Sequence, residues 1–439
     1  MSLPPLSLVP APLETIQGAA AAQRAGQATA ASLLESCLQK IERWEGEVQA
    51  WVSVDRPGAR RQAEERDAEL AAGRDRGPLH GIPLGIKDLI DLAGFPTGAG
   101  SALLSQQVVA TDAPLVSRLR QAGAVILGKT VTTQFACFDP PPTRNPWNLQ
   151  RTPGGSSSGS AAAVATGMCL GAIGSQTGGS ITRPASFCGV AGCKPTYGTI
   201  PVQGVYPVAK SLDHPGPIAR CVGDLAILLE TLAGSAPLPR QPAAPPRVGR
   251  LHGLFDERAL PAARDALDRT VRLLAAQGAA VCEATLPASF ADLLRSHRTI
   301  MLYELYQVHG ERFAAHPGDY LPGMTGLIHE AAQVAPAAYA AARAHQSQLG
   351  REIVDSFASA DVLVCPATIG PAPDPTTTGD PSFNSPWSFT GLPTVSFPIG
   401  QSTEGLPLGI QIVARSHDEG GLFRAALWCE RIVQESLAG

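Results

Sequence analysis

The sequence lacks the features that mark membrane, secreted and nucleic-acid-binding proteins. Its 439 residues carry 34 basic and 38 acidic side chains with no long run of either sign, so neither nucleic acid nor an anionic membrane surface is an expected partner. The longest run of small apolar residues, 161–173, is too short and too rich in glycine to span a bilayer. Residues 1–23 contain no basic residue and no long apolar core, which argues against a secretory signal peptide.

Cysteine pairs at ligand spacing are also missing. The nine cysteines are odd in number and scattered, with no C-x-x-C pair and no Cys/His spacing typical of zinc. We therefore expect reduced, mostly buried thiols in a cytoplasmic protein, without a disulfide framework. Neither a metal nor an organic cofactor is implied.

What is present predicts an α/β fold. Hydrophobic residues make up 44% of the chain, enough for a large core. Residues 12–45 show helical periodicity in two segments, with Thr29 as the cap of the second. From 81 to 200, short aliphatic runs alternate with glycine-rich turns and small-residue helices. The Pro- and Ala-rich stretch 234–246 is the best candidate for a linker, without marking a firm domain boundary. Further strands are predicted at 247–251, 280–286 and 361–366, and helices at 261–277 and 290–350.

Two short motifs suggest competing chemistries. Residues 123–130 match a phosphate loop, but Ala-Val-Ile-Leu between its glycines is typical of a buried strand, so nucleotide binding is not favoured. Residues 155–159 match the G-x-S-x-G nucleophile elbow around Ser157. An elbow needs an acid and then a histidine downstream, and since His214 and His417 follow, a Ser-His-acid esterase stays an alternative.

A longer pattern runs through residues 152–196. Glycine and serine alternate there with apolar residues, which favours tight packing at the centre of a fold over a linker. The glycine pairs 154–155 and 178–179 precede Ser156 and Ser180. Such turns bring backbone amides close to a reacting atom.

This pattern resembles the signature of the amidase signature family. GGSSSGS is followed, 24 residues after Ser156, by the serine of a GGS and then by Pro-Ala-Ser-Phe-Cys-Gly. Residues 81–88, Gly-Ile-Pro-Leu-Gly-Ile-Lys-Asp, resemble the lysine-bearing strand of the family. The resemblance extends from about residue 12 to the C-terminus and is least specific between 250 and 370. Other similar segments are 128–130, 145–147, 211–213, 386–387 and 390–393.

The resemblance implies the family's fold, a large twisted mixed β-sheet flanked by helices on both faces. It implies a single domain over residues 1–439. Within that domain we expect an N-terminal helical segment at 12–70, a signature core at 75–230 and a C-terminal part at 247–439, with a variable helical region at 290–350.

The resemblance also implies a Ser-Ser-Lys triad. In it Ser180 attacks the amide carbonyl, Ser156 relays the proton from a cis peptide, and Lys87 accepts the proton. An oxyanion hole would be formed by the backbone amides of Thr177, Gly178, Gly179 and Ser180.

Lys87 must be neutral to act as a base, although a free lysine has a pKa near ~10.4. Its apolar neighbours, Ile86 and Leu89, favour a buried strand, where loss of hydration disfavours the ammonium. Asp88 alternates to the other face and does not need to neutralise Lys87.

Two positions bear on the substrate. Gln176 stands where many relatives have Asp, and Arg183 follows the nucleophile by three residues. Both features are similar to malonamate-type amidases, in which an arginine binds a substrate carboxylate; a structural ion pair of Arg183 is the alternative. Pocket walls are expected from 290–350 and 370–390, where Tyr303, Tyr306 and His309 are candidates at helical spacing that also suit core packing.

The resulting hypothesis is an amidase acting on linear amide C–N bonds (EC 3.5.1.-, in particular 3.5.1.4). It would release ammonia or an amine from a small amide through an acyl-enzyme, and the amide would be carboxylated if Arg183 binds a substrate carboxylate. A homodimer is compatible with the sequence. The chain also resembles the A subunit of glutamyl-tRNA(Gln) amidotransferase, a glutaminase that needs partner proteins, although Gln176 and a short C-terminal half argue against that alternative. A catalytically silent scaffold is the third hypothesis.

Overall fold

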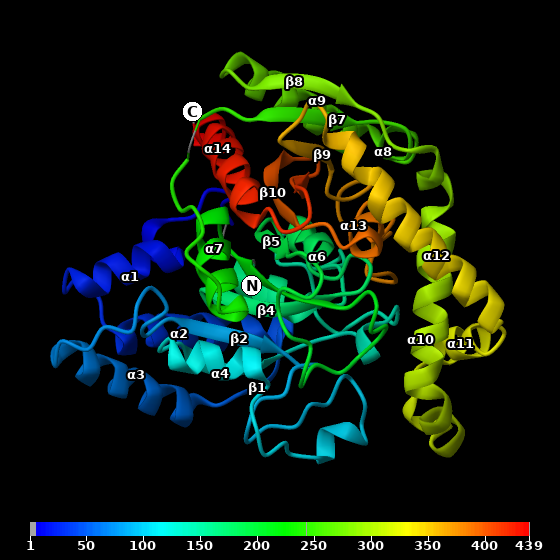
Figure 1. Cartoon of the computed structure of the whole chain (residues 1–439). Helices are drawn as coiled ribbons and strands as arrows, with labels where there is room; N and C mark the ends of the chain where they lie inside the picture. The colour runs from blue at the N-terminus through cyan, green and yellow to red at the C-terminus, as the bar shows by residue number, and fades with distance from the viewer. Residues whose placement is uncertain (1–5, 243, 439) are drawn as a thin grey trace.

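The protein is built on one mixed sheet of eleven strands, and the computed structural model describes residues 6–242 and 244–438 of it. The strand order is β1-β3-β2-β4-β6-β5-β10-β11-β9-β7-β8 (Figure 1). The strands are β1 Trp51–Val54, β2 Pro83–Lys87, β3 Val125–Thr130, β4 Gly171–Gln176, β5 Ala191–Lys194, β6 His214–Ala219, β7 Arg247–Leu251, β8 Ala280–Ala284, β9 Val362–Pro366, β10 Thr394–Gln401 and β11 Pro407–Val413.

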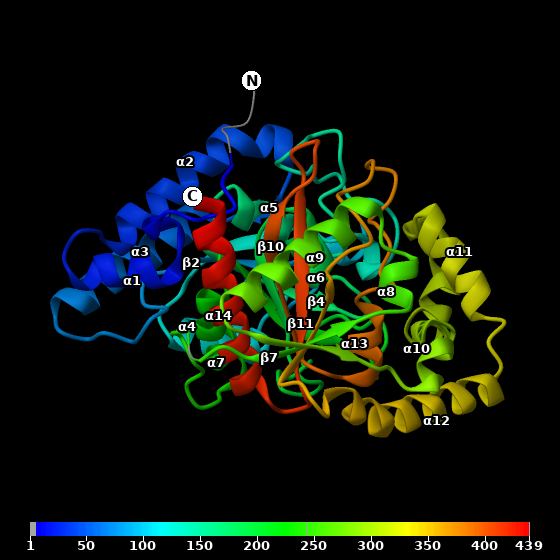
Figure 2. The same ribbon diagram turned by 90° about the horizontal axis from the view of Figure 1, so that it is seen from above.

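Helices cover the sheet and extend beyond one end of it. They are α1 Ile16–Arg24, α2 Ala30–Val48, α3 Arg56–Ala71, α4 Pro114–Gln121, α5 Ser158–Ala165, α6 Thr182–Phe187, α7 Val222–Ala233, α8 Leu254–Glu257, α9 Pro261–Ala276, α10 Leu293–Ala315, α11 Pro322–Ala331, α12 Pro336–Glu352, α13 Ser385–Thr390 and α14 Glu419–Ala438. Both views place α10, α11 and α12 at the end of the molecule opposite α1 and α3 (Figures 1 and 2).

Alternation along the strands places apolar side chains on both faces of the sheet. On β3, Ile126 joins the core beneath α4, α7 and α14, whereas Val125 and Leu127 join the core with α2 and α5. On β9, Val364 faces the first of these cores and Leu363 faces a third one, with α10 and α13. Because successive residues point to opposite faces, a strand segment covered on both sides is apolar at consecutive positions, as residues 125–127 and 362–364 are.

The topology bears out the predicted fold class. β2 is parallel to β3 and β4, whereas β4 pairs antiparallel with β6, and β10 pairs antiparallel with β11. Residues 234–246 connect α7 to β7, which lies in the same sheet as β1–β6, so this Pro-rich stretch joins two parts of one sheet.

Two local expectations, the cap of the helix at 30–48 and a buried strand in place of a phosphate loop, are confirmed. The Thr29 side chain caps α2 by accepting from the Ser32 backbone N–H. The phosphate-loop match is a buried strand: residues 125–130 form β3, and the Lys129 side chain forms an ion pair with Asp88. All nine cysteines are free thiols, seven of them buried. No helix in the described part of the chain is long and apolar enough to cross a membrane.

Candidate active site

Lys87, the last residue of β2, lies against two serine hydroxyls in the interior. Its Nζ is 2.7 Å from Ser156 Oγ and 2.9 Å from Ser175 Oγ, and its side chain is fully buried. Burial lowers the pKa of Lys87 well below its usual value, and the negative charge of Asp213 opposes that shift. A neutral lysine amine has a free lone pair, so this group has the chemistry of a base.

Ser156 precedes α5 and is joined to Gly155 by a cis peptide bond. The next residue, Ser157, donates its backbone N–H to the carbonyl oxygen of Ser180 at 3.2 Å. That bond ties the segment with Ser156 to the turn with Ser180. Of the sequence-predicted residues, Lys87 and Ser156 are therefore in direct contact, and Ser180 lies in the turn that is bonded to the residue after Ser156.

Ser157, the centre of the nucleophile-elbow match, has a different environment. It is fully buried, and its hydroxyl donates to the Ser175 carbonyl oxygen at 3.2 Å. His214 directs Nδ1 to the Leu212 carbonyl oxygen, and the His417 backbone N–H bonds to Thr196. Neither histidine is placed as the base of Ser157, which removes the basis for the esterase alternative.

The turn from Thr177 to Ser180 connects β4 to α6 and lines a cavity of about 180 Å³. Within residues 6–242 and 244–438, the backbone N–H groups of this turn donate to no other group of the chain. A Cβ on Gly179 would lie 2.6 Å from Asn384 Oδ1, so the close approach of Asn384 requires glycine there. Backbone N–H groups that have no other partner and lie in one turn can donate hydrogen bonds to an oxyanion.

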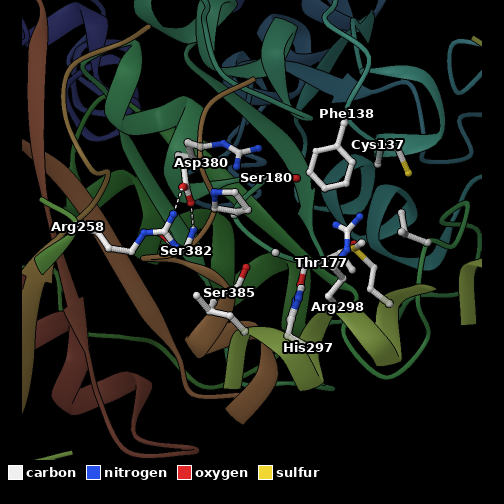
Figure 3. Close-up of a pocket in the computed structure, with 18 residues that line it drawn as sticks. Cys137, Phe138, Thr177, Ser180, Arg258, His297, Arg298, Asp380, Ser382 and Ser385 are labelled. Atoms are coloured by element: carbon white, nitrogen blue, oxygen red, sulfur yellow. Dashed lines mark hydrogen bonds and ion pairs between the residues drawn. The ribbon is translucent and has the colours of Figure 1, made fainter. Parts of the chain in front are cut away.

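The remaining walls of the cavity come from both halves of the chain, and α10 and residues 380–385 supply the part expected from 290–350 and 370–390 (Figure 3). His297, Arg298 and Met301 project from α10, and Phe138 stands across from them. Opposite α10, Arg258 forms an ion pair with Asp380 at 2.7 Å. Apolar and charged groups therefore share one small pocket, which suits a small polar ligand.

Arg183 lines the same pocket from α6 and is only partly satisfied. Its Nη2 donates to the Gly155 carbonyl oxygen at 2.8 Å and to Thr378 Oγ1 at 3.3 Å. Its Nε and Nη1 are buried without a partner among the described residues. Burial lowers the pKa of Arg183 to about 10, opposed by the charge of Asp380, so the guanidinium stays positive at neutral pH.

The family model named Amidase matches residues 32–423 of this chain. The chain belongs to the amidase family. The A subunit of the glutamyl-tRNA(Gln) amidotransferase of Koribacter versatilis (strain Ellin345) is 34% identical over 474 residues, covering 94% of this chain and 97% of the relative. A crystal structure of an amidase superposes with a TM-score of 0.87 at 31% identity, covering 95% of this chain and 99% of its own. For the peptide amidase from Stenotrophomonas maltophilia the TM-score is 0.84 at 31% identity, with 96% and 97% covered.

The structure of this amidase gives Gln176 a role other than the expected substrate contact. Its side chain is fully buried and is not part of the pocket wall. Its Oε1 accepts from the backbone N–H groups of Ile181 and Thr182, and its Nε2 donates to Ser388 Oγ. Gln176 therefore holds the turn that carries Ser180 and cannot reach a ligand.

Some pocket residues of this amidase were missed in the sequence. The expected candidates on α10 lie elsewhere: Tyr303 stacks on Tyr339, and His309 packs against Phe135. The histidine that faces the pocket is His297, whose Nε2 lies 2.9 Å from the Thr177 carbonyl oxygen. Its only signal in the sequence was its position in the region expected to form the wall.

Among the residues that the structure describes, no three His, Cys, Asp or Glu side chains gather as metal ligands would.

Proposed function

We propose that this amidase hydrolyses a small amide that carries a negative charge, through an acyl-enzyme on Ser180. The observation that carries the proposal is the contact of Lys87 Nζ with Ser156 Oγ at 2.7 Å, deep in the interior and beside the turn with Ser180. Lys87 would be the base, Ser156 the proton relay and Ser180 the nucleophile. They would act beside the backbone N–H groups of the turn with Ser180.

In the proposed first half-reaction, Ser180 Oγ attacks the amide carbonyl carbon. The Ser180 proton moves to Ser156 Oγ, and the Ser156 proton moves to Lys87 Nζ, which becomes an ammonium. The carbonyl oxygen gains negative charge and is stabilised by the amides of Gly178, Gly179 and their neighbours Thr177 and Ser180. When the C–N bond breaks, the leaving nitrogen takes a proton back along the same path.

In the second half-reaction, water replaces the amine. Water attacks the acyl carbon on Ser180 and gives a proton through Ser156 to Lys87. The ester bond breaks, Ser180 Oγ regains a proton, and a carboxylic acid leaves. The sum is one amide and one water converted to one acid and one amine or ammonia, with Lys87 neutral again.

Arg183 supports the choice of an anionic substrate. Two of its donors, Nε and Nη1, are buried without a partner in the described part of the pocket wall, which is costly unless a ligand satisfies them. A carboxylate accepts two parallel N–H bonds from a guanidinium. Monoamides of short dicarboxylic acids have both groups that the pocket would engage.

The second candidate function is that of the A subunit of a glutamyl-tRNA(Gln) amidotransferase. It is favoured by the 34% identity with the Koribacter versatilis protein of that name, over nearly the full length of both chains. In that case the amide would be glutamine, and the reaction would depend on partner proteins.

The test is labelling of the purified chain with a serine-reactive fluorophosphonate, followed by peptide mass spectrometry. We expect one adduct, on Ser180, that is absent in Lys87→Ala and retained in Ser157→Ala. Labelling at another serine, or labelling that survives Lys87→Ala, would overturn the proposal. Ammonia release from dicarboxylic monoamides by the chain alone would support the first candidate; release only from glutamine, and only when partner proteins are present, would select the second.

A further inference from the structure

Each carbonyl oxygen in the turn before Ser180 accepts a hydrogen bond from a different element. The Thr177 oxygen accepts from His297 Nε2 of α10 at 2.9 Å. The Gly178 oxygen accepts from Ser388 Oγ of α13 at 3.0 Å. The Gly179 oxygen accepts from the Arg183 backbone N–H at 2.9 Å, within α6.

These bonds determine where the amides of the turn point. In a trans peptide the C=O of one residue and the N–H of the next are fixed in one plane and point in opposite directions. A bond to the Thr177 oxygen therefore orients the Gly178 N–H, and a bond to the Gly178 oxygen orients the Gly179 N–H. Without such bonds two consecutive glycines have wide conformational freedom.

The same bonds also strengthen the amides as donors. A carbonyl that accepts a hydrogen bond polarises its peptide unit, so the N–H on the other side becomes a better donor. This matters most in a buried pocket, where the effective dielectric constant is low.

We propose that His297 and Ser388 are positioning residues, which hold the Gly178 and Gly179 amides in the orientation that binds the reaction's oxyanion. This inference rests on the proposed function, since it assumes attack by Ser180.

The state of His297 fits this task. Its Nε2 faces a carbonyl oxygen, which can only accept, so Nε2 must carry the proton. Burial lowers the pKa of His297 to about 4, so the ring is neutral at physiological pH. A neutral ring orients the amide without placing a second positive charge beside the pocket.

Ser388 is itself oriented by a third residue. Gln176 Nε2 donates to Ser388 Oγ at 3.3 Å, which directs the Ser388 hydrogen toward the Gly178 oxygen. The Oε1 of the same glutamine accepts from the backbone N–H groups of Ile181 and Thr182. Gln176 thus ties both ends of the turn to α13, which gives a physical role to a side chain that does not reach the pocket.

The test separates binding from chemistry in the labelling of Ser180. Saturation kinetics with the fluorophosphonate give a reversible inhibition constant and a maximal labelling rate. Direct removal of an oxyanion donor lowers rates by about 10²–10³-fold. Here the amides remain and only lose their orientation, so we expect about a tenfold lower maximal rate in His297→Phe and in Ser388→Ala, with the inhibition constant unchanged.

Rescue and control variants distinguish positioning from damage to the fold. His297→Gln keeps an N–H donor of similar reach and should recover most of the rate. His309→Phe removes another buried histidine of α10, one that contacts Tyr320, and should leave both constants unchanged.

The outcomes are distinct. Unchanged maximal rates in His297→Phe and Ser388→Ala would overturn the inference and leave the proposed function standing. Absence of any Ser180 adduct in the unmodified protein would overturn both. If His297→Phe does not fold, Ser388→Ala decides the matter, since it removes only one hydroxyl.

Discussion

Asp88 is the chain neighbour of Lys87, yet its carboxylate pairs with Lys129, Oδ1 to Nζ, at 3.1 Å. Both partners are almost fully buried, and Lys129 Nζ also donates to the carbonyl oxygens of Ile90 and Pro96. Lys87 itself forms no ion pair among the described residues, and its neighbours are serine oxygens. Because Asp88 pairs with Lys129 of the neighbouring strand, it does not pair with Lys87 and does not hold the Lys87 amine in its charged form.

The first prediction concerns the pH dependence of stability in Lys87→Met. Burial lowers the folded-state pKa of Lys87, so between that pKa and the unfolded value of ~10.4 the unfolded chain binds a proton that the folded chain does not. This group therefore contributes stability that is full above its unfolded pKa and is lost as pH falls from there through the folded-state pKa. In Lys87→Met that contribution vanishes, so the free energy of unfolding should rise less steeply with pH than in the unmodified protein.

Urea unfolding at a series of pH values checks this difference in slope. Labelling at Ser180 by the fluorophosphonate should fall by about 10²–10⁴-fold in the same variant, the usual contribution of a general base. Equal slopes in the two proteins would mean that Lys87 is charged in the folded state.

The second prediction concerns Ser175→Ala. The Ser175 hydroxyl lies 2.9 Å from Lys87 Nζ and accepts from it in the ammonium form. Its removal disfavours the ammonium, so the pKa of Lys87 should fall further and the acid limb of the labelling rate should move to lower pH. The lost hydrogen bond also loosens the amine, so the plateau rate should fall about fivefold. An acid limb that moves to higher pH would contradict this assignment.

The signature residues could be predicted from the sequence because the motifs around them resemble those of a known family, although Lys87 precedes Ser156 by 69 residues. Ser156 and Ser180 flank α5 and β4, so local turns bring them together, and Lys87 lies at the end of the neighbouring β2. The glycines at 178 and 179 were expected because they let backbone amides approach a reacting atom, and the structure adds a second reason, the close approach of Asn384 and Ser385.

The individual residues of the pocket wall on α10 could not be predicted, because they depend on how α10 is rotated against the core. The pocket-facing residues of α10 recur at helical spacing, namely Leu294, His297, Arg298 and Met301. Other sets of residues on α10 have the same spacing, so the sequence does not show which face of the helix lines the pocket. Tertiary packing determines that face. Gln176 was expected to contact the substrate, but one residue before the turn its side chain points away from the pocket and accepts from the Ile181 backbone N–H.

The third prediction concerns substrate charge and Arg183. If its free donors bind a carboxylate, then Arg183→Met should raise KM for a dicarboxylic monoamide by about 10- to 100-fold, the range for lost charge-assisted bonds. Arg183→Lys should not restore it, because a lysine lacks the two parallel donors. Inhibition by malonate should weaken in parallel.

The matched control for that series is Arg298→Met. Arg298 also lines the pocket, but its guanidinium is paired with Glu330, with Nε 2.8 Å from Oε1. We expect malonate inhibition to be unchanged in this variant. An unchanged KM in Arg183→Met would instead assign Arg183 a purely structural role through its bonds to Gly155 and Thr378.

The fourth prediction concerns a buried carboxyl far from the pocket wall. Glu430 of α14 accepts from the Val222 backbone N–H through both oxygens, at 2.9 and 3.0 Å. Burial raises its pKa from 4.5 to about 8, and the nearby Asp224 adds to the shift. Between these pH values the folded chain binds a proton that the unfolded chain has lost.

The sign of the effect follows from that difference in bound protons. Stability from Glu430 is full below its unfolded pKa and is lost as pH rises through the folded one, at up to about 1.4 kcal/mol per pH unit. Glu430→Gln is neutral throughout, so its free energy of unfolding should fall less between pH 5 and pH 8, as urea unfolding would show. Glu435→Gln is the control, because Glu435 is exposed on the same helix and pairs only with Arg431 among the described residues. If both variants showed the same pH dependence, Glu430 would have to be ionised in the folded protein, and its negative charge would then have to be stabilised by the Val222 N–H and the α7 N-terminus together.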